Sequence, residues 1–303
     1  MFSGATPELA PYQEEPKQLP SGGLGKDAFL RLGFERRGEK TALIELHRRA
    51  PLLVQQALHF DEEMPNLACV PIITTSGGIL QGDRYAIEIE LQADSQAHVT
   101  TQAATRIHEM DTNYAVQTQD IVLNEGAYLE YLPHPIIPYR HSRFINRTRL
   151  SIAASATLLY SEILMPGRKY YRDGELFAFD LFSSTLKAER PDGTALFTEK
   201  FIIEPHKSDL RRAGLMGSFD VFGNVLLIAP KKHCETVFSK LEPALDFTGG
   251  LVAAASRLPG EAGLIYKILG MESQMVRTKL REFWSLVRRE VVGADVPKEF
   301  LWA

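Results

Sequence analysis

The sequence predicts a mainly β protein, built as a stack of many strands with a small helical portion at its C-terminal end. Three observations support this fold class. Short stretches of alternating apolar and polar residues, separated by turn signals, run from about residue 27 to 230. A glycine-rich turn at residues 77–83 is followed by a strand pattern instead of a helix. Helical periodicity appears only after about residue 231.

Residues 1–25 are predicted to be a flexible tail. They contain four prolines and few large apolar side chains, so they cannot bury enough surface to offset the entropy lost on ordering. Residues 26–303 are predicted to form a single domain, with a β-rich body to about residue 230 and an α/β part over 231–303.

The strand pattern is clearest at residues 85–91. Tyr85, Ile87, Ile89 and Leu91 are apolar and alternate with polar or small residues, as a strand with one buried face requires. Residues 144–152 show the same period of two. No repeat of twenty to fifty residues is visible, so the sequence alone does not announce a solenoid or a propeller.

The turn at residues 77–83 (GGILQGD) resembles a phosphate-binding loop only in its glycine spacing. Such a loop continues with Lys and Ser or Thr, which supply positive charge and a magnesium ligand. Here Asp83 would repel a phosphate, and a strand follows where a nucleotide-binding fold needs a helix. The glycines are therefore predicted to punctuate β-structure.

Two C-terminal segments have helical periodicity. Residues 231–245 place Val237, Leu241 and Leu245 four apart. Residues 272–292 carry an apolar stripe and a charged remainder, which predicts a helix packed on the β-body. The stripe comprises Met275, Val276, Leu280, Phe283, Trp284, Val287 and Val291, with Arg288 among the charged residues outside it.

Composition excludes several classes of function. With 34 basic and 38 acidic residues the formal charge is −4, so no basic field for nucleic acid is present. No run of eighteen apolar residues could span a membrane. Two distant cysteines, Cys69 and Cys234, make a disulfide framework improbable. A soluble protein of the cytoplasm is expected.

No constellation in the sequence specifies catalysis. The usual local signatures of a nucleophile are absent, and the eight histidines are scattered. His108 with Asp111, and separately His134 with His141, are weak candidates for borderline metal ligands, with ordinary loop polarity as the stronger interpretation.

Four segments together carry a family resemblance. The first is the double glycine Gly77-Gly78 with the Gly82-Asp83 pair and the run Thr100–Thr105 (TTQAAT), which includes Thr101 and Gln102. The others are residues 129–133 (LEYLP), residues 159–168 (LYSEILMPGR), and Phe283-Trp284 with the closing Trp302. In this order, from about Lys26 to the end of the chain, they resemble the urease accessory proteins of the UreD/UreH family.

The resemblance implies a fold and a function. The fold would be a β-helix-like stack of strands. The function would be that of a non-enzymatic maturation scaffold, or chaperone, that docks the urease apoprotein and a UreF-type partner, which in turn holds a UreG-type GTPase. No cofactor would be tightly bound, and nickel would pass through an internal path. Asp83, Glu162 and Glu199 carry over as carboxylates of that path.

Each of these residues also has a plainer interpretation. Asp83 would cap a turn, Glu162 would point outward from a strand, and Glu199 would form a salt bridge. Arg168, after Pro166-Gly167, would lock a turn. Pro166 departs from the family pattern, which leaves the geometry of that turn open. Two alternative functions are a β-helical hydrolase or lyase with an acidic groove, and a metal-storage protein with a ligand-dense segment.

Overall fold

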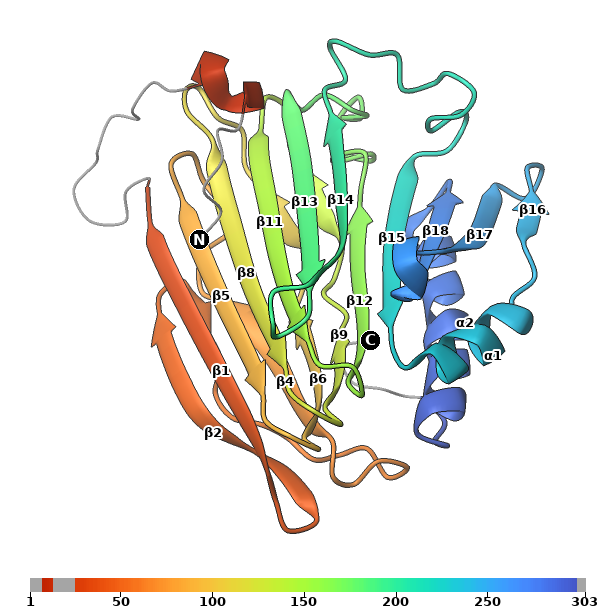
Figure 1. The fold of residues 1–303 in the computed structure, drawn as a ribbon. Helices are drawn as coiled ribbons and strands as arrows, with labels where there is room; N and C mark the ends of the chain where they lie inside the picture. Colours follow the sequence, from red (N-terminus) through yellow and green to blue (C-terminus); the bar gives the residue numbers. More distant parts are fainter. Residues whose placement is uncertain (1–6, 13–24, 299–303) are drawn as a thin grey trace.

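The computed structural model describes residues 7–12 and 25–298 of the chain, and its strands form two sheets (Figure 1). The first sheet has seven strands. In spatial order these are β14 (Ala195–Ile203), β13 (Leu181–Glu189), β11 (Arg143–Ile152), β8 (Ala115–Leu123), β5 (Arg84–Leu91), β1 (Asp27–Arg37) and β2 (Lys40–Arg49).

The second sheet has eleven strands. Its main path is β16 (Ala244–Asp246), β17 (Leu251–Arg257), β18 (Leu264–Gly270), β15 (Val221–Ile228), β12 (Thr157–Leu164), β9 (Tyr128–Tyr131), β6 (Gln96–Thr101), β4 (Ala68–Thr74) and β3 (Leu52–Leu53). Two short strands complete it: β10 (Ile136–Pro138) pairs with β12, and β7 (Thr105–Ile107) pairs with β10.

From β4 to β13 the chain alternates between the sheets. Strands β5, β8, β11 and β13 lie side by side and parallel in the first sheet, while β4, β6, β9 and β12 do the same in the second. Each return to a sheet therefore adds a parallel strand next to the previous one, as successive turns of a flattened coil would. The mainly β class and the C-terminal helical portion are confirmed, and a β-helix in the strict sense stays a prediction.

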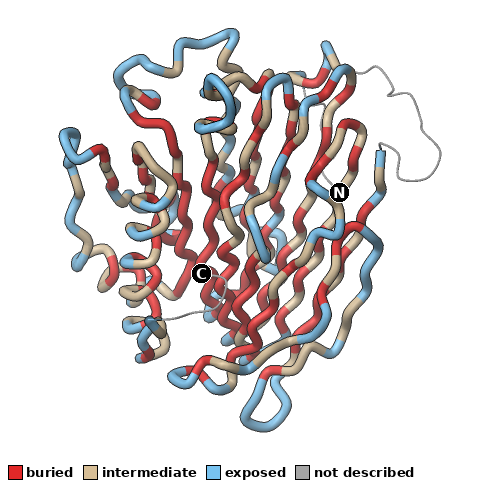
Figure 2. The backbone as a smooth tube through the Cα atoms, turned by 180° about the vertical axis from the view of Figure 1, so that it is seen from behind, coloured by how far each residue is buried: buried red, intermediate tan, exposed pale blue. Residues whose placement is uncertain are grey.

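The main core lies between the two sheets. The inward residues of β5, Tyr85, Ile87, Ile89 and Leu91, are all buried, which confirms the period of two read from the sequence. Figure 2 shows the buried segments running along the strands and the exposed ones at the loops. All eight residues of β12 are buried, because this strand is covered on both faces.

The C-terminal part forms a second core on the outer face of the second sheet (Figure 1). Helix α2 (Ser273–Val291) packs there through Val276, Leu280, Phe283 and Trp284, as its apolar stripe predicts. Helix α1 (Lys231–Ser239) is shorter than its predicted range. The chain leaves the helix before Pro243, which has no N–H for a helical hydrogen bond, and Leu245 lies on β16 instead.

The described part of the N-terminal segment differs from the expected flexible tail. Residues Pro7–Tyr12 form the short 3₁₀ helix η1, whose Leu9 is buried against Val116, Ile145 and Leu181 of the first sheet. Glu8 also forms an ion pair with Lys200. These two contacts explain why residues 7–12 are ordered. The proline-rich composition of the segment gives no sign that a single leucine is buried against the sheet. Residues 1–6 and 13–24 of the predicted tail lie outside the described residues, as does Trp302.

Among the helices of the described ranges, none has the length and apolar character that a membrane crossing requires.

Candidate functional site

A polar cavity of about 210 Å³ lies between the two sheets. Its exposed lining residues mark its mouth, and they are Thr74, Gly77, Gln102, Ala103 and Arg106. Its buried residues with polar groups lie on strands of both sheets. They are Tyr85, Gln119, Tyr131, Asn146, Tyr160, Ser161 and Glu162.

The mouth is built from two of the sequence segments singled out above. The double-glycine turn is held against residues 106–108 by the N–H of Ile79, which donates to Arg106 O at 2.8 Å, and by the N–H of His108, which donates to Ile79 O at 2.9 Å. Gly78 has φ 152°, and a Cβ at this position would lie 2.6 Å from Arg106 O. Only glycine allows this close approach, so the residue type is set by the packing of the mouth.

Thr101 and Gln102 lie on the opposite rim of the same opening. The hydroxyl of Thr101 accepts a hydrogen bond from the N–H of His134 at 2.9 Å and donates to Ala103 O at 3.0 Å. The N–H of Gln102 donates to Ile72 O at 2.9 Å. These residues therefore fix the course of the chain at the rim, and the structure brings them together with Gly77 and Gly78.

A hydrogen-bond network crosses the interior between the sheets. The hydroxyl of Tyr131 donates to Gln119 Oε1 at 2.5 Å, and Gln119 Nε2 donates to Asn146 Oδ1 at 3.1 Å and to Thr148 at 2.9 Å. Asn146 Nδ2 in turn donates to Glu162 Oε2 at 2.5 Å. Side chains from β8, β9, β11 and β12 thus form one buried polar chain that ends at Glu162.

Glu162 points inward from β12 and is 4% exposed. Burial raises its pKa, while hydrogen bonds from Asn146 and Ser184 oppose the rise, and the resulting value is about 7. Oε1 of this carboxyl group has no hydrogen-bond partner among the described residues. The site therefore holds a carboxyl group that changes charge near neutral pH and has one oxygen available to a ligand.

The polar row continues beyond Glu162 across the second sheet. Asn224 of β15 pairs with Glu162 in the strand register, and Lys267 of β18 pairs with Asn224 on the other side. Asn224 Nδ2 donates to Glu199 Oε2 at 2.9 Å, and Lys267 forms an ion pair with Glu199. Glu199 lies on β14, the edge strand of the first sheet, and is partly exposed. The row therefore leads from the cavity to the surface between β14 and β18.

Asp83 does not line this cavity. Its Oδ2 accepts the N–H of Leu80 at 2.9 Å, and its Oδ1 accepts the N–H of Lys26 at 2.8 Å. Gly82 before it has φ 77°, a conformation that favours glycine. Both carboxylate oxygens of Asp83 therefore hold the turn to the start of β1, which favours the interpretation as a turn cap.

Arg168 is locked to Glu175 by two parallel hydrogen bonds, from Nε to Oε2 at 2.7 Å and from a terminal nitrogen to Oε1. Its guanidinium also lies over the rings of Tyr139 and Tyr171, at 4.0 and 3.9 Å from their centroids. Gly167 has φ 129°, and a Cβ there would lie 2.3 Å from Glu175 O. This geometry favours the structural interpretation of Arg168.

The weak metal candidates His108 and Asp111 do not gather a ligand set. The His108 ring contacts Gly77 O at 3.2 Å, and the N–H of Asp111 donates to Gln81. Within residues 7–12 and 25–298, neither belongs to a group of three side chains able to share an ion.

The expectation for one charged residue of α2 is wrong, because it lies in a buried ionic cluster. Arg288 was expected outside the helix's apolar stripe, but it is 0% exposed. It donates to Glu130 Oε1 at 2.6 Å and to Asp61 Oδ2 at 2.6 Å, and Trp284 and His98 also bond to Glu130. Burial would raise the pKa of Glu130, but the Arg288 charge and the hydrogen bonds from His98 and Arg288 lower it to about 2. The carboxylate partners explain why a charge is tolerated there.

Sequence reasoning also missed Gln119, Asn146, Asn224 and Lys267. Each lies on a strand face whose other residues, at every second position, are mostly apolar. Gln119, for example, shares its face with Ile121 and Leu123. A polar residue at an inward position of a strand is the signal that points to a polar interior.

The fold and the cavity define a mainly β protein of two sheets with a polar interior site. A model of the UreD urease accessory protein family matches residues 26–303. The protein named urease accessory protein UreD 2 of Brucella suis biovar 1 is 60% identical over 300 residues, which cover 99% of each chain. The urease accessory protein UreD of Yersinia pseudotuberculosis serotype O:1b is 47% identical over 296 residues, 98% of this chain and 92% of its own. This chain belongs to the UreD family of urease accessory proteins.

Proposed function

We propose that this chain acts in the maturation of urease as a non-enzymatic accessory protein. The observation that carries the proposal is family membership over residues 26–303, supported by relatives named urease accessory protein that are matched over 99% and 92% of their own length. A location in the cytoplasm, where urease would be assembled, remains part of the proposal.

We further propose that nickel is a cargo that passes through the interior, not a resident cofactor. The cavity and the row beyond it offer carboxylate and amide oxygens of Glu162, Asn224 and Glu199. Such oxygens bind Ni²⁺ less firmly than imidazole or thiolate would, and a passing ion needs sites that it can leave. A carboxyl group with a pKa of about 7 gains its charge when a cation displaces its proton.

The proposed partners are the urease apoprotein, a UreF-type protein and, through it, a UreG-type GTPase. Exposed apolar side chains that lie next to one another support docking of other proteins, since contiguous apolar patches mark interaction sites. Leu245 and Phe247, each 67% exposed, lie together at the β16 edge of the second sheet, and Tyr170 is 78% exposed in the loop before β13.

The alternative of a hydrolase or lyase has weaker support. Such an enzyme needs an acid and a base that face one groove. Among the described residues that line the cavity, Glu162 is the only carboxyl group, and its immediate partners are an amide and a hydroxyl. A storage role would need a dense set of ligands, which the cavity lining does not offer.

Co-expression with the urease subunits and the remaining accessory proteins tests the proposal. Omission of this chain should abolish both urease activity and bound nickel, and its return should restore both. Unchanged activity without it would remove the maturation role.

The path is tested in the same system with Glu162→Ala and Glu199→Ala, using Glu189→Ala as a matched control. Glu189 is an acid of β13 that pairs with Arg149 outside the cavity. The two path variants should lower nickel loading while co-purification with the partners is retained. Full loading in the double variant, equal to that of the control, would exclude these residues from the path.

A further inference from the structure

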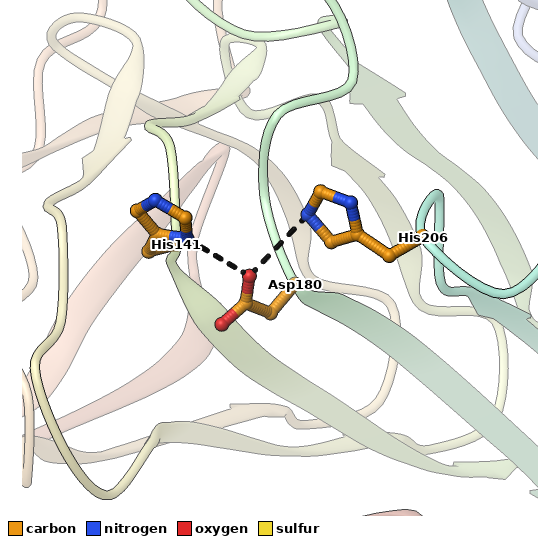
Figure 3. A group of neighbouring side chains, drawn as sticks. All are labelled: His141, Asp180 and His206. Carbon is orange, nitrogen blue, oxygen red and sulfur yellow. Dashed lines mark hydrogen bonds and ion pairs between the residues drawn. The ribbon is translucent and has the colours of Figure 1, made fainter.

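A cluster of two histidines and one aspartate lies near the starts of β11 and β13 in the first sheet (Figure 3), and none of its members lines the cavity. His141 is in the turn before β11, Asp180 directly precedes β13, and His206 follows β14. In the ranges 7–12 and 25–298 this is the one group of at least three metal-ligating side chains whose ligand atoms lie near one another. Two loops and a strand end, far apart in sequence, converge here.

The spacing of the ligand atoms fits a small divalent ion. Asp180 Oδ1 lies 3.2 Å from His141 Nδ1 and 3.5 Å from His206 Nε2, and all three atoms lie within 4.8 Å of one another. Ligands about 2.0–2.1 Å from a tetrahedral ion are separated by roughly 3.4 Å. Both carboxylate–imidazole distances are close to that value, and the histidine side chains are more than half exposed, so small rotations can close the third edge.

The backbone holds two of the three ligands in place. The N–H of His141 donates to Ala178 O at 2.9 Å, and the N–H of Asp180 donates to Ser142 O at 3.0 Å. These bonds join the turn of His141 to the segment that carries Asp180. Side-chain rotation is therefore the main freedom that an incoming ion has to restrict.

Arg143 orients the carboxylate. Its guanidinium binds Asp180 Oδ2, at 2.9 Å from Nε and 2.7 Å from a terminal nitrogen, which turns Oδ1 towards the two imidazoles. Arg143 is itself fixed by Met110 O and Asn113 O and lies over the ring of Tyr12. Partners that orient a ligand from behind are typical of metal sites. The Arg143 charge also weakens cation binding, so the site would be exchangeable.

We propose that His141, Asp180 and His206 form a surface site for a borderline divalent transition-metal ion of the Ni²⁺ or Zn²⁺ class. Imidazole nitrogens with one carboxylate suit such ions better than Mg²⁺ or Ca²⁺, which prefer oxygen. Three protein ligands leave a position for water, as in open metal sites. The proposal stands on this geometry alone and does not depend on the role of the interior cavity.

Titration of the purified, chelator-treated full chain with Ni²⁺, and separately with Zn²⁺, tests the site by calorimetry. His141→Ala and His206→Ala should each weaken one binding event by more than about tenfold, and the double variant should lose it. His47→Ala is the matched control, since His47 is 64% exposed and pairs with Glu45 at 3.2 Å in the same manner, outside the group of three. Both substituted histidines are exposed, so the variants should fold.

Two results would overturn the proposal. In the first, the double variant binds the ion with the same affinity as the unchanged chain and His47→Ala. In the second, the unchanged chain binds neither Ni²⁺ nor Zn²⁺. The two exposed histidines would then be partners of Asp180 in ordinary hydrogen bonds. Glu162→Ala should leave this binding event intact. Failure of the surface site is thereby distinguished from failure of the interior path.

Discussion

Glu162 of β12 and Asn224 of β15 lie directly opposite each other in the second sheet. Each has a buried oxygen, Oε1 and Oδ1 respectively, that accepts no hydrogen bond from a described residue. Residues opposite each other in an antiparallel pair project from the same face, so both side chains face the interior. Buried oxygens without donors are costly, because they lose their hydrogen bonds to water. Two of them side by side indicate a place shaped for water or a cation, and not for packing alone.

Replacement of Glu162 by Gln should change how stability depends on pH. The pKa of Glu162 is raised from 4.5 to about 7 in the fold, so the unfolded chain loses this proton first as pH rises. The free energy of unfolding therefore falls across that interval, by at most on the order of 3 kcal/mol. Glu162→Gln should remove this fall and gain stability relative to the unchanged protein between pH 5 and pH 8, as followed by urea unfolding. Glu189→Gln is the control, and parallel pH profiles for all three proteins would contradict the expected burial effect.

The ion pairs of Arg288 should be a large contribution to stability. Arg288→Met would leave Glu130 and Asp61 buried without their cation, which typically costs about 3–5 kcal/mol. Arg289→Met, one position along the helix, removes an exposed pair with Asp295 and should change stability by less than about 0.5 kcal/mol. Chemical unfolding of the two variants measures the difference. Equal, small effects would mean that the buried carboxylates find other partners.

The burial of Arg288 could not be predicted from the sequence, because it depends on contacts with distant residues. The apolar stripe of α2 was readable because its period is local, and the inward face of β5 was readable for the same reason. Glu130, the partner of Arg288, lies 158 residues away along the chain, and no local sequence pattern predicts such a contact. The inward direction of Glu162 likewise follows from a non-local contact, its hydrogen bond from Asn146 of the first sheet. Periodicity identified the elements, while their non-local pairing determined the site.

The double glycine at the cavity mouth should be sensitive to a single methyl group. Gly78→Ala places a Cβ 2.6 Å from Arg106 O, so the mouth has to open or the turn has to shift, at a cost of about 1–3 kcal/mol or more. Gly193→Ala is a matched control, because Gly193 also has a positive φ, of 88°, but no described atom lies within 4 Å of the added methyl group. In thermal unfolding, Gly78→Ala should have a clearly lower melting temperature than Gly193→Ala. Equal melting temperatures for the two variants would show that the contact with Arg106 relaxes without a loss of stability.

The two cysteines should behave as structural thiols. Cys69 and Cys234 are 1% and 5% exposed, and burial raises the pKa of both thiols. Negative charge on Glu130 adds to the rise at Cys69. Because the thiolate is the reactive form, a thiol reagent at pH 8 should label neither residue quickly in the folded chain, and should label both rapidly in urea. Rapid labelling of one cysteine in the folded protein would show that its surroundings open on the time scale of the reaction. Cys69→Ser and Cys234→Ser, measured separately, would then identify which part of the core beneath α2 opens, since both thiols belong to that core and only Cys234 lies on α1.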